Sequence, residues 1–192
     1  MTSSPLNSSK HPWGARDGWA TLDTPSELDG SRDGLGDLVV SERDRDVALW
    51  WVGVHGGAGE TTLERLFRGT RASGHRWPVA PPPAKPVVVL VARTDARGLR
   101  AAQSAMRDWQ LRELDLEVLG LVLMADAPTR RPRVLRDFER VLSGGVPRVW
   151  SVPWVESWRA GEVASRANSP KEAERLLADL RSAGPLGGEA GM

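Results

Sequence analysis

The chain has 192 residues, a length that fits one domain with room for terminal segments. Its 26 basic and 25 acidic residues leave a formal net charge of +1, which excludes a strongly basic nucleic-acid arm and an acidic activation domain. The sequence has no cysteine, which excludes a disulfide scaffold, a thiolate metal site and a cysteine nucleophile. The longest apolar run is too short to cross a bilayer, so we expect a cytoplasmic protein without a membrane span.

The near-neutral total hides two segments of opposite charge. Residues 1–46 contain nine acidic and five basic residues, whereas the rest of the chain has a net charge of +5. The first segment is also rich in Ser, Gly and Pro and has no helical or strand period, which predicts a disordered acidic leader over 1–46. The remaining boundaries that we expect are a domain over 47–183 and a flexible tail over 184–192.

From residue 47 onward, buried strands alternate with amphipathic helices. Apolar runs predict strands at 47–54, 87–91, 117–124 and 146–152, and a proline-rich connector over 78–86 precedes the second of them. Apolar residues at helical spacing predict helices that begin near Thr61, at Thr94 or Asp95, at Thr129 and at Ser169. This alternation predicts an α/β fold with a mostly parallel central sheet of about five strands, flanked by helices.

The most informative segment joins the first strand to the first helix through a glycine-rich loop. Glycines allow backbone N–H groups to surround an anion, and two hydroxyl residues follow at the start of the helix, which is the context of a phosphate-binding loop. The residues that would form such a site are His55, Gly56, Gly57, Ala58, Gly59, Glu60, Thr61 and Thr62. The alternative is an ordinary glycine-rich turn in another doubly wound domain.

This loop resembles the deviant Walker A loop of the ParA/MinD family of P-loop ATPases, whose pattern is Lys-Gly-Gly-x-Gly-Lys-Thr-Thr. The glycines and both threonines match, but His55 and Glu60 stand where the family has its two lysines. The loop also resembles that of uncharacterised proteins of high-GC bacteria with the same His-Gly-Gly-Ala-Gly sequence. The resemblance covers roughly residues 47–160, and the Walker B strand of the family has no match.

The resemblance implies a three-layer, P-loop NTPase-like sandwich that holds ATP or ADP through loop N–H groups, with Thr61 as the Mg²⁺ ligand. Two like charges about 4 Å apart repel by about 4 kcal/mol at an effective dielectric constant of about 20, so Glu60 would oppose a phosphate. Phosphate binding would then require Glu60 to turn away, to be protonated or to be bridged by Mg²⁺. We therefore expect a pseudo-ATPase that binds nucleotide at most.

By the same resemblance, such a protein would have no catalytic residue of its own and would act through a protein partner, with a homodimer as one option. The system would be one of partition, conjugation or positioning. Two alternatives stay open at this stage. The first is an active ATP or GTP hydrolase that uses a cation from elsewhere, for instance an arginine. The second is a DNA-associated interaction module.

The DNA alternative depends on a cluster of basic residues in the third predicted helix. These residues are Arg130, Arg131, Arg133, Arg136 and Arg140. Several phosphate contacts suffice for non-specific DNA binding, but interleaved acidic residues also favour a solvated helix face.

Three further features have two interpretations each. Asp95 and Asp126 each follow a strand and would hold Mg²⁺ or act as a base, with helix capping as the other interpretation of Asp95. The tryptophans at 150, 154 and 158 would pack between strand and helix or form an exposed patch for a partner.

Overall fold

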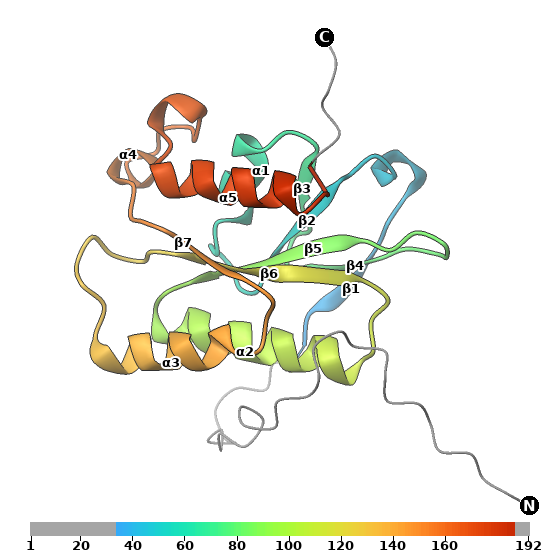
Figure 1. Cartoon of the computed structure of the whole chain (residues 1–192), viewed down its shortest axis with the longest axis horizontal. Helices are drawn as coiled ribbons and strands as arrows, with labels where there is room; N and C mark the ends of the chain where they lie inside the picture. Colours follow the sequence, from blue (N-terminus) through green and yellow to red (C-terminus); the bar gives the residue numbers. More distant parts are fainter. Residues whose placement is uncertain (1–33, 187–192) are drawn as a thin grey trace, which may run out of the picture.

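The computed structural model describes residues 34–186 and has an α/β architecture in three layers (Figure 1). Its elements in chain order are β1 (Gly36–Val39), η1 (Glu42–Asp44), β2 (Leu49–Gly53), α1 (Glu60–Leu66), β3 (Thr70–Ala72), β4 (Arg76–Val79), β5 (Val87–Arg93), α2 (Ala96–Leu111), β6 (Glu117–Met124), α3 (Arg133–Ser143), β7 (Val149–Val152), α4 (Glu156–Arg159), η2 (Arg166–Asn168) and α5 (Lys171–Ser182).

The central sheet has five strands in the order β3-β2-β5-β6-β7, and every neighbouring pair is parallel. Helices α2 and α3 cover one face of this sheet, whereas α1 and α5 cover the other (Figure 1). The predicted fold class, a mostly parallel sheet of about five strands flanked by helices, is confirmed. Each crossover returns the chain to the same edge, so the carboxyl ends of the strands lie together.

The sheet is buried on both faces, which explains why its strands have continuous apolar sequences. Trp50 and Trp51 illustrate this, because successive side chains of a strand point to opposite sides. Trp51 packs with Leu63 of α1 and Leu176 of α5, whereas Trp50 packs in the other core cluster with residues of α2. Trp50 is 2% exposed and Trp51 is fully buried, so the strand that leads into the glycine loop is anchored in both cores.

A second sheet of two strands includes the most N-terminal strand of the described chain, β1. Strand β1 pairs in parallel with β4, whose Trp77 is fully buried and donates its Nε1 hydrogen to Asp108 Oδ2 of α2 at 2.6 Å. Arg112, the C-cap of α2, donates to the carbonyl of Leu35 at 3.1 Å and to Asp37 at 2.6 Å. The predicted acidic leader is therefore too long, because its residues 34–46 include β1 and η1. Its residues 1–33 lie outside the described part of the chain.

Other boundaries differ from the sequence prediction because of proline. Strand β7 begins at Val149 rather than at 146, since Pro147 has no N–H to donate to the sheet. Helix α3 begins at Arg133 with Pro132 as its N-cap, and not after a Thr129 cap. Helix α5 begins at Lys171 with Pro170 as its N-cap. The expected connector over 78–86 begins inside β4, and β3 was not expected at all.

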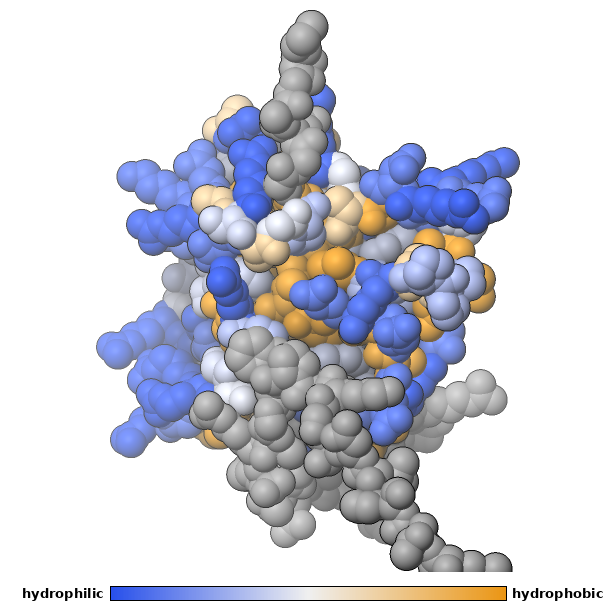
Figure 2. Space-filling model, turned by 45° about the vertical axis from the view of Figure 1, so that its right-hand side comes forward, coloured by the Kyte–Doolittle hydropathy of each residue, from blue (hydrophilic) through white to orange (hydrophobic). Residues whose placement is uncertain are grey.

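The described surface mixes charged and apolar side chains. Figure 2 shows an apolar area in the middle of one face, with hydrophilic side chains projecting around it. Val39 of β1 and Leu111 of α2 are large hydrophobic residues that are 75% and 83% exposed, respectively. No helix within residues 34–186 combines the length and the apolar character needed to span a bilayer.

Candidate functional site

The glycine loop lies between the end of β2 and the start of α1, at the carboxyl edge of the parallel sheet. Gly57 and Gly59 have φ angles of +77° and +109°, which residues other than glycine rarely adopt. A Cβ atom added to Gly56 or Gly57 would meet nothing within 4 Å, so the outer side of the loop is open. Ligands in open α/β sheets bind at this edge, and the predicted loop is therefore in a position where a ligand would bind.

Glu60, the last residue before the two threonines, turns away from the open side of the loop. Its side chain is only 5% exposed, and its Oε2 accepts the N–H of Gly53 at 2.5 Å. Its Oε1 lies 3.4 Å from Nδ1 of His75, which also lies 2.9 Å from the carbonyl oxygen of Gly53. Of the three conditions derived from the sequence, the structure has the first, because the carboxylate points into the fold.

The close approach of Glu60 and His75 requires glycine at position 53. A Cβ atom there would lie 2.7 Å from Glu60 Oε2 and 2.8 Å from His75 Nδ1, distances that real contacts of this kind do not show. His75 itself has a positive φ of 58°, which places its ring beside the end of β2. Glu60 is thus a buried side chain that contacts Gly53 at the end of β2 and His75, and not an exposed surface side chain.

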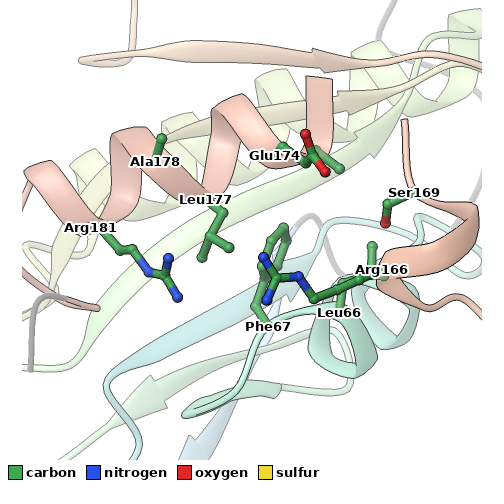
Figure 3. A pocket seen from close by; sticks show the side chains of 9 residues that line it. Leu66, Phe67, Arg166, Ser169, Glu174, Leu177, Ala178 and Arg181 are labelled. Carbon is green, nitrogen blue, oxygen red and sulfur yellow. The ribbon is translucent and has the colours of Figure 1, made fainter. Parts of the chain in front are cut away.

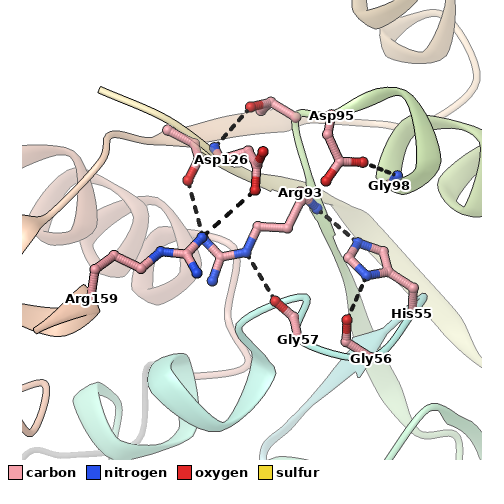
Figure 4. Close-up of polar contacts among 10 residues, drawn as sticks. His55, Gly56, Gly57, Arg93, Asp95, Gly98, Asp126 and Arg159 are labelled. Carbon is pink, nitrogen blue, oxygen red and sulfur yellow. Dashed lines mark hydrogen bonds and ion pairs between the residues drawn. The ribbon is translucent and has the colours of Figure 1, made fainter. Parts of the chain in front are cut away.

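Arg93, the last residue of β5, extends its guanidinium to the glycine loop (Figure 4). Its Nε donates to the carbonyl of Gly57 at 2.9 Å, and its NH1 donates to the carbonyl of Ala125 at 3.1 Å. A guanidinium has five N–H donors, so three remain without an acceptor among residues 34–186. The side chain is held from two loops, yet it keeps donors for an anion.

Burial lowers the pKa of Arg93, and the positive charge of Arg159 lowers it further, while Asp126 and Asp95 raise it in part. An arginine stays protonated under any ordinary condition, so this direction reports that its charge is poorly compensated. A positive charge that burial and a like charge both destabilise would gain from a bound anion. The electrostatics at the loop therefore favour a negatively charged ligand.

His55 has its ring fixed by two backbone contacts. Its Nε2 accepts the N–H of Arg93 at 3.1 Å, and its Nδ1 lies 2.9 Å from the carbonyl oxygen of Gly56. This pair of partners assigns the neutral tautomer with the hydrogen on Nδ1. His55 thus joins the loop to the end of β5, and both of its ring nitrogens are engaged by the backbone.

Two aspartates predicted as candidates follow β5 and β6, but their carboxylates have other partners. Asp95 is the N-cap of α2 and accepts the N–H of Gly98 at 2.7 Å, which confirms the capping interpretation. Asp126 lies 3.8 Å from the guanidinium of Arg159, whose Cζ in turn lies 4.8 Å from the centre of the Trp154 ring. Asp126 and Arg159 therefore form the rim of the site next to Arg93 (Figure 4).

The threonines after the loop differ in accessibility. Thr61 is exposed at the start of α1, and Thr62 is half-buried. No group of three or more His, Cys, Asp or Glu side chains in the described part of the chain could hold a metal ion. Of the predicted binding residues, Gly56, Gly57 and Thr61 are therefore exposed, whereas Ala58 and Glu60 are buried.

The arginine cluster of the DNA alternative is largely paired within its own helix region. Arg131 forms an ion pair with Glu139, and Arg136 donates to the carbonyl of Arg131 at 2.8 Å. Arg133 and Arg140 lie 3.6 Å and 3.1 Å from Asp137, respectively. Two carboxylates thus pair with three of the five arginines, which fits the solvated-face interpretation but leaves these residues together with a net charge of +3.

The three tryptophans that recur every fourth residue each donate to a different acceptor. Trp150 is buried and donates to Asp179 of α5 at 2.9 Å, as expected for strand-to-helix packing. Trp158 donates to Asn168 at 3.0 Å, and Trp154 to Glu156 at 2.6 Å. Only part of the series is therefore core packing, and Trp154 instead lies at the rim with Arg159.

Sequence reasoning did not single out Arg93, His75 or Arg159 as site residues. Arg93 was the last residue of a predicted strand, and its place at the carboxyl edge of a parallel sheet is the signal that could have identified it. His75 is 22 residues away from Gly53 in the sequence, and Arg159 is 66 residues away from Arg93. Both lie in segments without a recognisable motif. Their positions follow from the tertiary structure alone.

The fold and the site together define an α/β protein with a glycine loop at the carboxyl edge of a parallel sheet. A family model described as "Family of unknown function (DUF6668)" matches residues 47–175, and the chain belongs to this family. The glycine loop, Arg93, Asp126 and Arg159 all lie within the matched range. No curated protein and no solved structure matches the chain.

Proposed function

We propose that this chain is a degenerate P-loop protein, similar to the ParA/MinD family, that binds a nucleotide at most and is not an efficient ATPase. It would act through protein partners in a partition, conjugation or positioning system, as the resemblance of the loop implies. The glycine loop between a buried parallel strand and a helix supports this proposal, since backbone N–H groups in such loops bind phosphates.

One observation carries the proposal: the negative side chain of Glu60 points into the fold, whereas the positive side chain of Arg93 contacts the loop. The buried carboxylate of Glu60 accepts the N–H of Gly53 and lies beside His75, whereas the guanidinium of Arg93 donates a hydrogen bond to the carbonyl of Gly57. A phosphate at the loop would then meet the cation of Arg93 and not the carboxylate of Glu60. Helix α1 has only seven residues, so Arg93 rather than the helix dipole would supply most of the positive potential.

The same residues fit a phosphate-bearing anion better than a magnesium ion. Magnesium in nucleotide sites is usually held by one or two carboxylates together with phosphate oxygens and water. Here Asp95 caps α2 and Asp126 lies near Arg159, which leaves the Thr61 hydroxyl as the accessible ligand at the loop. Mg²⁺ bound with a nucleotide would neutralise phosphate charge beside Thr61, but no step of the proposal needs the metal.

Calorimetric titration of the full chain with ATP, ADP and GTP, each with and without Mg²⁺, tests the proposal. We expect binding of at least one nucleotide with a Kd between about 1 μM and 1 mM, since a few charged hydrogen bonds supply free energies of about 4–8 kcal/mol. We also expect no phosphate release from Mg-ATP above that of a buffer blank. Absence of binding to all three nucleotides would contradict a nucleotide site at the loop, and phosphate release above the blank would contradict the claim that the chain is not an efficient ATPase.

A second candidate function is an ATP or GTP hydrolase with a noncanonical cation, and Arg93 is the observation that favours it. Arginine stabilises charge on a transferring phosphoryl group in many enzymes. Phosphate release that Thr61→Ala abolishes, and that Arg97→Gln leaves unchanged, would establish this second function and overturn the first. The DNA alternative has less support, because carboxylates and a carbonyl of its own region already engage the arginines of α3.

A further inference from the structure

A groove separate from the glycine loop runs between the carboxyl end of α1 and helix α5. Two adjoining cavities of about 260 Å³ and 740 Å³ form it, and they share Leu66, Phe67, Leu177 and two arginines as lining residues. The larger volume lies in the range of sites that accept a sizeable ligand, well beyond the needs of a single inorganic anion. The groove therefore offers room for an extended or helical segment.

The floor of this groove is apolar. Phe67, at the end of α1, is 4% exposed and belongs to the core beneath the groove. Leu66 is 9% exposed, and Leu177 of α5 is partly buried against the same core. Figure 3 shows Phe67 and Leu177 facing the same space between the two helices. A ligand that reaches this floor would have to present apolar side chains to it.

The walls of the groove carry four arginines: Arg65 and Arg68 on one side, and Arg166 and Arg181 on the other. In Figure 3 the guanidinium groups of Arg166 and Arg181 both extend over the cavity. Within residues 34–186, no carboxylate lies within ion-pair distance of any of these four guanidinium groups. This contrasts with α3, where Arg133 and Arg140 both lie within ion-pair distance of Asp137.

Two acidic residues line the cavities as well, Asp46 and Glu174, so the lining has a net charge of +2. Uncompensated arginines around an apolar floor combine two kinds of recognition in one groove. The apolar floor binds hydrophobic side chains, whereas the walls select negative charge and reject positive charge.

We propose that this groove binds an acidic amphipathic peptide segment of a partner protein. Such a segment presents Leu, Phe or Trp side chains along one face and Asp or Glu beside them, at the i, i+3, i+4 and i+7 spacing of groove-binding helices. Nucleic acid would satisfy the arginines but not the apolar floor. The inference does not rest on nucleotide binding, because α1 separates the groove from the glycine loop.

A displayed library of random peptides of about 12 residues, selected on the full chain, tests the proposal. The selected peptides are then synthesised with a fluorophore, and their affinity is measured by fluorescence anisotropy. The test variant carries Arg166→Glu and Arg181→Glu, two exposed positions that form no ion pair within residues 34–186. The matched control carries Arg97→Glu and Arg100→Glu, two exposed arginines of α2 on the opposite layer. Thermal melting checks that both variants fold.

We expect selected peptides to combine acidic and apolar residues at helical spacing. The test variant should bind them at least about tenfold more weakly, and the control variant should bind within about twofold of the wild type. Enrichment of basic or purely apolar peptides would overturn the proposal, as would equal losses in both variants or a failure to select any binder. Tighter binding of a DNA duplex, lost in the test variant only, would overturn it in favour of a nucleic-acid site.

Discussion

Glu60→Ala removes the carboxylate that accepts the amide hydrogen of Gly53 at the end of β2. The contact has an oxygen–nitrogen distance of 2.5 Å and a side chain that is 5% exposed, so water does not replace the lost acceptor easily. His75 also loses the carboxylate that lies 3.4 Å from its Nδ1. We expect the variant to fold with a lower free energy of unfolding.

The magnitude follows from the kind of hydrogen bond that is lost. A hydrogen bond to a charged group contributes about 1.5–3 kcal/mol, and a buried donor left without an acceptor costs a similar amount. Burial of a carboxylate also has a desolvation cost, which the alanine variant avoids, so we expect a net loss near the lower end, about 2 kcal/mol. For a domain of this size, that corresponds to a melting temperature lower by about 4–8 °C.

Thermal unfolding followed by circular dichroism, together with urea titration, measures this loss. Glu64→Ala is the matched control, since Glu64 lies one turn further along α1 and forms no ion pair within residues 34–186. The control should stay within about 0.5 kcal/mol of the wild type. Glu60→Gln keeps an oxygen acceptor without the charge, and should lie between the wild type and Glu60→Ala.

Equal melting temperatures for Glu60→Ala and Glu64→Ala would refute this reasoning. Such a result would mean that Glu60 is not bound beneath β2 in solution and is available to the open side of the loop. The charge repulsion calculated from the sequence would then apply again, and Glu60→Ala should raise nucleotide affinity.

Three further predictions concern a helix cap, the glycine loop and the attachment of β1. Asp95→Ala should lower the stability of the protein by about 1 kcal/mol in urea titration through loss of the α2 cap, and Asp95→Asn should restore most of it. Gly59→Ala should cost about 1–3 kcal/mol in thermal melting, because its φ is +109° and the new Cβ would lie 3.2 Å from Met124; an unchanged melting temperature would contradict this backbone geometry. Arg112→Ala should accelerate amide hydrogen exchange in β1, because the hydrogen bond that Arg112 donates to Asp37, which raises the pKa of Arg112, would be lost; exchange that stays equal in β1 would show that this tether is dispensable.

Much of the fold was predictable because its strands are buried on both faces. The runs around Trp50, Val89 and Leu121 have no polar interruption, which is typical of parallel central strands. Strands β1, β3 and β4 lack such runs, since each has three or four residues and a half-exposed or edge position. Their pairing depends on backbone hydrogen bonds that any sequence can form, so sequence pattern gives no sign of them.

The site was predictable in its backbone and not in its side chains. The order of strand, glycine loop and threonines correctly located the turn at the carboxyl edge of the sheet. The direction of Glu60 was not predictable, because it depends on Gly53 and on His75 from the segment between β3 and β4. The role of Arg93 likewise depends on the adjacency of β2 and β5, which are far apart in sequence.

The most direct test of the proposed function is the nucleotide affinity of Arg93→Gln compared with that of Arg97→Gln. Calorimetry on the full chain should show that Arg93→Gln weakens ADP and ATP binding at least about tenfold, or about 1.4 kcal/mol, because the cation at the loop is lost. Arg97→Gln, which replaces an exposed arginine of α2, should bind as the wild type does. Equal affinities for the wild type and both variants would contradict the assignment of Arg93 as the cation of this site.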